Sequence, residues 1–206
     1  MPARLLLMRH AETATPRIFH GAESDIGLSE YGVETSNCVA SYFASLRLDG
    51  VVSSAMRRAV DTATPIAAAC RVALRQERQL HERRIGELSG TPTDADHPFR
   101  TETLQNWMTG NTAFASPGAE SFDDVRDRAV PVLNRLALEF DNRTALIVAH
   151  GATIKISLLS ILPGWSSADW GKLGLIRNLA VTVLVHDKGE WRAEQIAQVP
   201  PIIATS

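Results

Sequence analysis

The stretch Leu5-Leu6-Leu7-Met8-Arg9-His10-Ala11-Glu12-Thr13 joins an uninterrupted apolar run to an arginine and a histidine. An apolar run of this length is typical of a parallel strand that is buried on both faces. Arg9 and His10 then lie at the carboxyl end of the strand, the edge where open α/β sheets bind ligands. Taken alone, this pair would also fit an ordinary polar loop.

Two further apolar runs end in the same way. Leu146-Ile147-Val148-Ala149 is followed by His150 and Gly151, and Val51-Val52-Ser53-Ser54 is followed by Arg58 in the first turn of an expected helix. The carboxyl ends of parallel strands meet at one edge of a sheet. The three runs together therefore predict one positively charged pocket that contains two imidazoles.

These residues belong to a series of motifs that resembles the histidine phosphatase superfamily, which has the phosphoglycerate mutase-like fold. The family pattern begins with Arg-His-Gly, where this chain has Ala11 in the third place. The other motifs are Ser-x-x-x-Arg-Ala-x-x-Thr-Ala at 54–63, Leu-x-Glu at 80–82 with later glycines at 86 and 90, Pro-Gly-x-Glu-Ser at 117–121, and Val-x-His-Gly at 148–151. They follow the family's order and span residues 4 to about 160, which makes the resemblance specific.

Strand-like and helix-like segments alternate along the chain. After the first strand, strands are expected at residues 50–54, 72–76 and 144–149, with a terminal hairpin from 179–185 and 191–196. Helices are expected at residues 30–46, 56–70, 101–108, 122–140 and 152–162. This alternation predicts an α/β fold, a three-layer sandwich whose mainly parallel central sheet has an antiparallel edge and helices on both faces.

The length of the chain favours one domain. Residues 1–206 are expected to form it, with an irregular insert at about residues 90–117. This insert contains three prolines. It is either a lid or specificity element, since loops on a rigid scaffold carry function, or a packed excursion without such a role.

The composition narrows the classes of function. The chain is 45% hydrophobic and 21% charged, with a formal net charge of -2, and gives no support to binding of nucleic acid or of a membrane surface. No apolar run reaches about 18 residues and the first is too short for a signal peptide, so a cytoplasmic location is expected. The expected partner is a small phosphorylated substrate, and nothing indicates an oligomeric state.

The sequence also predicts helix bends at two prolines and the burial of single cysteines and histidines. Pro65 is expected to kink or break the helix at 56–70, and Pro131 to bend the one that contains it. Cys38 and Cys70 are expected to be small buried hydrophobic residues. The histidines outside the motifs are expected at the surface; they are His20, His81, His97 and His186.

The pocket residues suit phosphoryl transfer, which needs an in-line nucleophile, positive charge on the equatorial oxygens and a proton for the leaving oxygen. His10 is the candidate nucleophile, because an unprotonated imidazole nitrogen can accept a phosphoryl group. The planar guanidinium groups of Arg9 and Arg58 suit phosphate oxygens. His150 is expected to donate to the phosphate, together with backbone N–H groups of the helix that begins near Gly151.

The family resemblance implies further roles. Glu82 of the Leu-x-Glu motif is expected to protonate the leaving oxygen and then to activate water. Arg17 and Ser24 lie in the first loop, where family members contact substrate, although Pro16 stands near the place of a family asparagine. If the family glycine is left-handed, Ala11 in its place is expected to be strained.

A metal site is the main chemical alternative. Metal ligands are usually closely spaced, as in His-x-x-x-His, and neither His10 nor His150 has such a partner. The neighbouring arginines would also repel a cation. We therefore expect chemistry without a metal ion or another cofactor.

The expected function is hydrolysis of a small phosphorylated metabolite through a phosphohistidine intermediate by a metal-independent histidine phosphatase. A cofactor-dependent phosphoglycerate mutase is one alternative. Mutases of the family carry a tyrosine where this chain has Ile85 and a lysine at the place of Thr93, and they carry paired arginines where the insert offers only Arg100. A non-catalytic phosphate-binding protein of the same fold is the other alternative, and retention of Glu82 argues against it.

Overall fold

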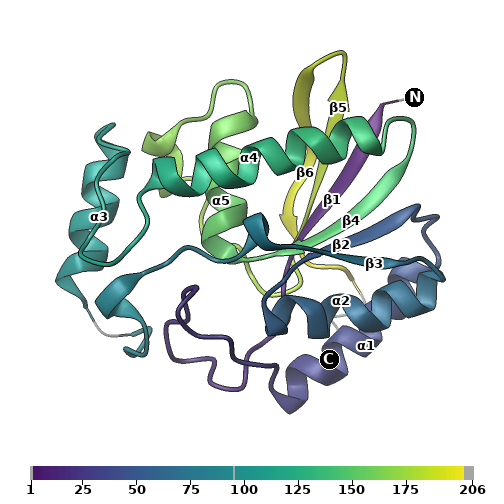
Figure 1. The fold of residues 1–206 in the computed structure, drawn as a ribbon, viewed down its shortest axis with the longest axis horizontal. Coiled ribbons are helices and arrows are strands. Elements are labelled where there is room, and N and C mark those ends of the chain that lie inside the picture. Colours follow the sequence, from purple (N-terminus) through teal and green to yellow (C-terminus); the bar gives the residue numbers. More distant parts are fainter. Residues whose placement is uncertain (1, 95, 202–206) are drawn as a thin grey trace.

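Strand β1 (Ala3–Arg9) lies inside a six-stranded sheet in the computed structural model, which describes residues 2–94 and 96–201 (Figure 1). The other strands of this sheet are β2 (Gly50–Ser54), β3 (Leu74–Glu77), β4 (Thr144–Ala149), β5 (Val181–Asp187) and β6 (Glu190–Gln198). Their order across the sheet is β3-β2-β4-β1-β5-β6. The first four strands in this order run parallel, and β5 and β6 add an antiparallel edge.

Helices cover both faces of the sheet (Figure 1). One face carries α1 (Glu30–Ala44) and α2 (Arg57–Cys70), and the other carries α4 (Phe122–Glu139) and α5 (Gly151–Ile161). The remaining helical elements are α3 (Pro98–Met108) and the short 3-10 turns η1 (Arg78–Leu80), η2 (Gly86–Leu88) and η3 (Ser167–Trp170). The predicted α/β fold with helices on both faces is confirmed.

The apolar run of β1 is buried because its side chains alternate between the two helical layers. Leu5 and Leu7 pack with α4 and α5, whereas Leu6 and Met8 pack with α1 and α2. All four side chains are at most 6% exposed. Burial of each stabilises the fold by about 1.5–3 kcal/mol, so the backbone at the carboxyl end of β1 is firmly fixed.

Two local expectations differ from the structure. Pro65 does not break the helix, since α2 continues to Cys70 and the apolar residues that follow Pro65 pack on the sheet; the alternative, a kink at Pro65, stays a prediction. Cys38 is exposed, since the buried face of α1 is formed by residues such as Val39 and Phe43, and Cys38 falls outside it. Cys70 is half-buried beside the same core.

The irregular insert is docked on the helical layer. Trp107 of α3 is 1% exposed and meets Phe122 and Trp170 edge-on, with ring centroids 5.7 and 5.3 Å away. Its indole N–H donates to the carbonyl of Phe114 at 2.9 Å. These contacts hold the insert against α4 and η3, so it is a packed part of the fold.

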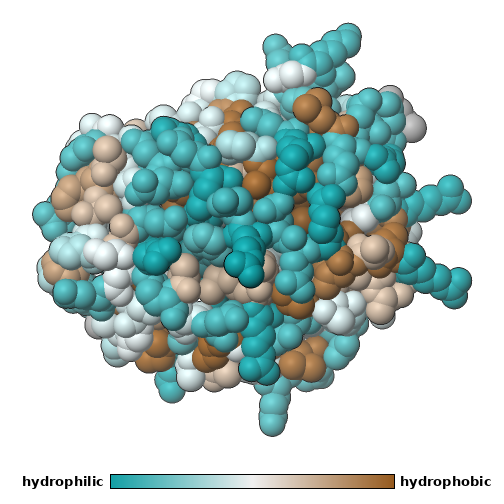
Figure 2. Space-filling model, viewed as in Figure 1, coloured by the Kyte–Doolittle hydropathy of each residue, from teal (hydrophilic) through white to brown (hydrophobic). Residues whose placement is uncertain are grey.

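The surface is mostly polar on the face shown in Figure 2, where apolar atoms are exposed in scattered areas. Leu138 and Leu175 are the most exposed large apolar side chains in the described ranges, at 72% and 79%. None of the helices in these ranges is long and apolar enough to cross a membrane.

Candidate active site

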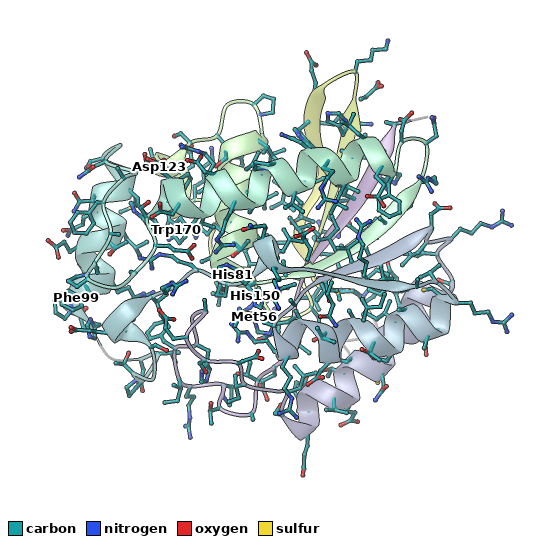
Figure 3. The ribbon with its side chains drawn as sticks, in the orientation of Figure 1. Met56, His81, Phe99, Asp123, His150 and Trp170 are labelled. Carbon is teal, nitrogen blue, oxygen red and sulfur yellow. The ribbon has the colours of Figure 1, made fainter. Side chains whose placement is uncertain are left out.

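The carboxyl ends of β1, β2 and β4 bring three of the predicted residues together. His10 follows β1, Arg58 lies in the first turn of α2 after β2, and His150 follows β4 as the N-cap of α5. The ring centroids of His10 and His150 are 5.1 Å apart, and all three side chains are at most 5% exposed. Figure 3 shows His150 close to His81 and Met56, near the middle of the molecule.

The ring of His10 is held in one tautomer. Its Nδ1 lies 2.7 Å from the carbonyl oxygen of Ala11, and because a carbonyl can only accept, Nδ1 carries the proton. Nε2 is then left with a free lone pair. Burial, followed by the positive charges of Arg9 and Arg58, holds the pKa of His10 well below its ordinary value, although the bond to Ala11 acts in the opposite direction. His10 is therefore a neutral imidazole at neutral pH.

Arg9 offers donors that the protein does not use. Its Nη1 donates to the carbonyl of Ile176 at 2.6 Å, whereas its buried Nε has no hydrogen-bond partner in the described residues. A Cβ placed on Gly151 would lie 3.6 Å from this Nε, which locates the guanidinium beside the N-terminus of α5. A buried donor without an acceptor is costly, so the side of Arg9 that carries Nε is suited to an anion.

Arg58 is used differently from Arg9. Its Nη1 and Nη2 donate to the carbonyls of Ser24 and Gly21 at 2.8 and 3.2 Å, and its Nε donates to Nδ1 of His150 at 3.2 Å. Most of its N–H groups therefore tie the first loop and His150 to the sheet. The two-oxygen grip expected of both arginines fits Arg9 better than Arg58.

His150 is fixed by two contacts. Since Arg58 donates to its Nδ1, the single proton of the neutral ring lies on Nε2, which is 2.7 Å from Oγ of Ser54. Burial, followed by the charges of Arg58, His10 and Arg9, keeps the pKa of His150 well below its ordinary value. His150 can donate to a phosphate, as the sequence suggests, only by exchanging the bond to Ser54.

These contacts also bear on the metal alternative. Among the described residues, no three or more histidine, cysteine, aspartate or glutamate side chains are gathered in a cluster that could hold a metal ion. The lone pair on Nδ1 of His150, which a metal would need, accepts a hydrogen bond from Arg58.

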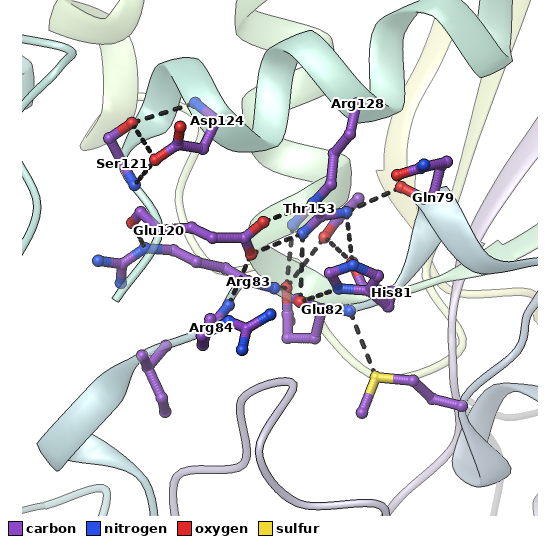
Figure 4. Close-up of polar contacts among 12 residues, drawn as sticks. Gln79, His81, Glu82, Arg83, Arg84, Glu120, Ser121, Asp124, Arg128 and Thr153 are labelled. Carbon is purple, nitrogen blue, oxygen red and sulfur yellow. Dashed lines mark hydrogen bonds and ion pairs between the residues drawn. The ribbon is translucent and has the colours of Figure 1, made fainter. Parts of the chain in front are cut away.

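Glu82 caps the N-terminus of α5. Its carboxylate accepts from the backbone N–H groups of Ala152 and Thr153 at 3.2 and 3.1 Å, from the hydroxyl of Thr153 at 3.2 Å and from the N–H of Arg83 at 2.8 Å (Figure 4). The backbone groups that were expected to assist phosphate binding thus already hold a carboxylate. The N–H of Gly151, at the first helical position, has no intrahelical acceptor and stays suited to an anion.

A half-buried ion pair braces the backbone around Glu82 (Figure 4). Arg128 of α4 donates to the carbonyls of His81 and Glu82 at 2.9 and 3.2 Å and to the carboxylate of Glu120 at 2.8 Å. Burial acts to raise the pKa of Glu120, but hydrogen bonds from Arg128 and from the N–H of Arg84 keep it below its ordinary value. Glu120 is therefore a partner of Arg128 and a poor proton donor.

The first loop contacts the site mainly through its backbone. The carbonyl of Ser24 accepts from Arg58, whereas the Ser24 hydroxyl lies 2.8 Å from Nδ1 of His20. Arg17 is exposed, and only its carbonyl has a described partner, the N–H of Thr93. The surface position expected for four histidines is met only in part, since all of them are half-buried: His20, His81, His97 and His186. The carbonyl of His20 lies within 3.4 Å of Nη2 of Arg58.

Ala11 is not strained. It is absent from the non-glycine residues with positive φ, it is fully buried, and its N–H donates to Oγ1 of Thr62 at 3.0 Å. The condition on which strain was expected is therefore not met, because the backbone here is within reach of any L residue.

Some residues of the site were missed by sequence reasoning. Ser54 and Thr62 lie inside the motif at 54–63, which was a usable signal for both. Asn178 donates to the carbonyl of His10 at 2.8 Å across 168 positions of chain, and Arg128 reaches His81 across 47. Neither of these belongs to a motif or a periodic pattern.

Comparison with known proteins identifies a family. The model of the histidine phosphatase superfamily (branch 1) matches residues 5–199. Some curated relatives are 34% identical to the chain over 160 residues, which are 76% of it, and the chain spans only 43% of their length.

This chain matches a larger share of three other similar proteins. A metal-independent phosphoserine phosphatase of Arabidopsis thaliana is 28% identical over 91% of this chain and 78% of that protein. A probable phosphoglycerate mutase of Yersinia pestis is 27% identical over 92% of this chain and 88% of that protein. The native structure of a mycobacterial glucosyl-3-phosphoglycerate phosphatase matches with a TM-score of 0.82 and 26% identity, over 96% of this chain and 100% of that one.

Proposed function

The chain belongs to the histidine phosphatase superfamily, and from that premise we propose that it is a metal-independent phosphomonoesterase of a small phosphorylated metabolite that acts through a phosphohistidine. One observation carries the proposal. The bond from His10 Nδ1 to the Ala11 carbonyl leaves Nε2 unprotonated on a buried side chain, and the positive charges of Arg9 and Arg58 act on it. Such a nitrogen is suited to attack a phosphate, whose negative charge the arginines stabilise.

The first step transfers the phosphoryl group to His10. The lone pair of Nε2 bonds to phosphorus while the bond from phosphorus to the leaving oxygen breaks. Glu82, in its protonated form, gives its proton to that oxygen, which leaves as an alcohol. Glu82 must first exchange its bonds to the N-terminus of α5, and the arriving phosphate can take over those N–H groups.

The second step returns the enzyme to its starting form. A water oxygen bonds to phosphorus, the bond from phosphorus to Nε2 breaks, and its electron pair returns to the imidazole of His10. The Glu82 carboxylate takes the proton that the water gives up. One phosphomonoester and one water are consumed, and one alcohol and one inorganic phosphate are formed.

The charged oxygens of the phosphate require stabilisation throughout. We assign this to the Nε side of Arg9, to the remaining donor capacity of Arg58 and to the N–H of Gly151. His150 joins them when it releases Ser54. Contacts of Arg17 and Ser24 with the rest of the substrate stay predictions.

Two observations favour a phosphatase over a mutase. Ile85 takes the place of the family tyrosine, so its side chain offers no hydroxyl to a second anionic group. The guanidinium carbon of Arg100 lies 5.7 Å from the ring centroid of Phe19, so this cation already has a partner.

The experiment that tests the proposal is turnover of p-nitrophenyl phosphate together with trapping of the phosphoenzyme under alkaline conditions, where phosphohistidine survives. Wild-type protein should turn over and carry label, and His10→Ala should do neither, with a loss of about 10⁴-fold or more in rate. His186→Ala, on the far strand β5, is the matched control and should behave as wild type. Label retained by His10→Ala would place the nucleophile elsewhere.

The same preparation separates the alternatives. Conversion of one phosphoglycerate isomer into the other with 2,3-bisphosphoglycerate, in the absence of net hydrolysis, would establish a mutase instead. Binding of inorganic phosphate without turnover of any phosphomonoester would establish the non-catalytic protein.

A further inference from the structure

The loop before β5, residues 174–180, is bonded to the end of β1 at four places. Nη1 of Arg9 donates to the carbonyl of Ile176 at 2.6 Å, and the backbone N–H of Arg9 donates to the carbonyl of Ala180 at 3.2 Å. The N–H of Leu179 donates to the carbonyl of Arg9 at 3.0 Å. Nδ2 of Asn178 donates to the carbonyl of His10 at 2.8 Å. Only the last of these bonds involves the proposed nucleophile.

The carbonyl that Asn178 holds belongs to a peptide unit that is held at its other end as well. The peptide between His10 and Ala11 consists of the His10 carbonyl and the Ala11 N–H. Asn178 donates to the carbonyl, and Oγ1 of Thr62 accepts from the N–H at 3.0 Å. Thr62 is itself fully buried, and its hydroxyl donates to the carbonyl of Arg58 at 2.7 Å. The plane of this one peptide is thus fixed from both sides.

The orientation of this peptide decides the state of the nucleophile. A peptide unit is planar, so fixing it restricts rotation about the bonds on either side, which belong to His10 and Ala11. Those rotations set where the Ala11 carbonyl lies relative to Nδ1 of His10, at 2.7 Å in the structure. The acceptor at Nδ1 is what keeps Nε2 unprotonated.

The geometry of the loop supports a role of this kind. Leu179, which follows Asn178, has φ of 59° although it is neither glycine nor asparagine, and it is only 2% exposed. Left-handed backbone at a bulky residue persists only where the surroundings enforce it, and such strain gathers at functional sites. At the other end of the loop, Nζ of Lys155 on α5 donates to the carbonyl of Gly174 at 2.6 Å.

We propose that Asn178 and Thr62 are positioning residues that hold the His10–Ala11 peptide and thereby keep His10 in the tautomer with Nε2 free to attack. The inference rests on the proposed function for its kinetic consequence. Its structural part, the tautomer of His10, is independent of turnover.

Paired variants test the proposal. Asn178→Ala removes the donor, Asn178→Asp keeps the shape but offers only acceptors, and Asn134→Ala, which loses a bond to Trp191, is the control. Thr62→Val removes the hydroxyl at constant shape, whereas Thr62→Ser retains it. Folding of each variant is checked by circular dichroism and thermal unfolding.

Two measurements are made on these proteins. The ¹⁵N chemical shifts of His10 report the tautomer, and should change from one N–H at Nδ1 to a mixture in Asn178→Ala and Thr62→Val. The burst rate of enzyme phosphorylation by p-nitrophenyl phosphate should fall about 10- to 100-fold in these variants and in Asn178→Asp, and stay within about 3-fold of wild type in Thr62→Ser and Asn134→Ala. The double variant Asn178→Ala with Thr62→Val should lose less than the product of the two single losses, because both side chains hold one peptide.

The outcomes separate this proposal from the proposed function. Folded Asn178→Ala or Thr62→Val that keeps the Nδ1 tautomer and the wild-type burst rate would refute the positioning role and leave the phosphatase intact. A changed tautomer in a chain whose wild type has no phosphatase activity would refute the function and support the positioning role. Multiplicative losses in the double variant would show that the two residues do not act on a shared peptide.

Discussion

The nucleophile side and the acid side of the candidate site are held in opposite ways. On the nucleophile side, His10 bonds to the carbonyl of Ala11, and Asn178 and Thr62 hold the peptide between them. On the acid side, the Glu82 carboxylate takes the N–H groups at the start of α5, which a phosphate would also use. The proposed nucleophile therefore already has its reacting arrangement, whereas the proposed acid has to change partners first.

The two sides of the candidate site also differ in how deeply their side chains are buried. His10 and His150 are 5% and 0% exposed, whereas Glu82 is half-buried and stands two positions before the exposed Arg84. The backbone that carries Glu82 is nevertheless well fixed, since Arg128 holds the carbonyls of both His81 and Glu82. In the proposed mechanism, the change of partners on the acid side therefore falls to the side chain of Glu82.

The largest effect expected from the acid side depends on the leaving group. Glu82→Gln should slow phosphorylation of the enzyme by an alkyl phosphate by about 10² to 10⁴-fold, because an alkoxide cannot leave without a proton. The loss should be clearly smaller with p-nitrophenyl phosphate, whose product is a stable anion. Burst kinetics measure this step apart from the attack of water, in which Glu82 also takes part in the proposed mechanism.

Glu87→Gln, on the exposed turn η2, is the control for this experiment and should leave both substrates unaffected. Glutamine keeps the size of Glu82 and one acceptor oxygen, so the cap of α5 is weakened but not removed. Equal slowing of both substrates by Glu82→Gln would mean that Glu82 orients the phosphate or supports α5, and the contrast between the two sides would be lost.

A smaller effect is expected from the nucleophile side on changing pH. Burial holds the pKa values of His10 and His150 well below their ordinary value of about 6.5, so the unfolded chain binds more protons than the folded one as the pH falls below that value. This contribution to stability is fully present above about pH 6.5. As the pH falls towards the folded pKa, each histidine lowers the free energy of unfolding by about 1.4 kcal/mol per pH unit.

Urea unfolding at several pH values measures this slope. His10→Gln should reduce the slope by the share of one histidine. An identical slope in His10→Gln and wild type would show that His10 is not held neutral by the fold, which would weaken the account of the nucleophile.

No effect at all is expected from removal of metal ions. The positive charge in the proposed mechanism comes from arginines, and Nδ1 of His150 accepts a hydrogen bond from Arg58. Turnover of p-nitrophenyl phosphate should therefore survive exhaustive dialysis against EDTA. If activity were lost and an added divalent ion restored it, catalysis would depend on a metal centre and the proposed role of His10 would be contradicted.

The parts of this molecule that the sequence predicts well are those with a strong local signal. Buried strands such as β1 and β4 are continuous apolar runs. His10, Arg58 and His150 each belong to a motif that follows such a strand, so the sequence predicts that they meet at one edge of the sheet. Asn178 could not be found in this way, because its partner is a backbone carbonyl 168 positions away. Backbone carbonyls carry no sequence identity, so a side chain that binds one leaves no pattern.

The errors have a related cause. A helical pattern identifies the face of α1 that is buried only approximately, and Cys38 lies just outside it. The strain expected at Ala11 assumed a backbone angle that no pattern of residue types reports. The competition between Glu82 and a phosphate for the start of α5 depends on atomic positions, which neither a motif nor a periodicity encodes.

The position of Glu82 also has a consequence for product inhibition. An anion that uses the N–H groups of Ala152 and Thr153 has to displace a carboxylate that is tethered to the same chain and so is present at a high effective concentration. In the proposed mechanism this internal competitor would lower the affinity of the site for any oxyanion that uses those N–H groups, including released phosphate. In the proposed mechanism the covalent bond to His10 would not be subject to that competition, so released phosphate would be held less tightly than the phosphorylated intermediate.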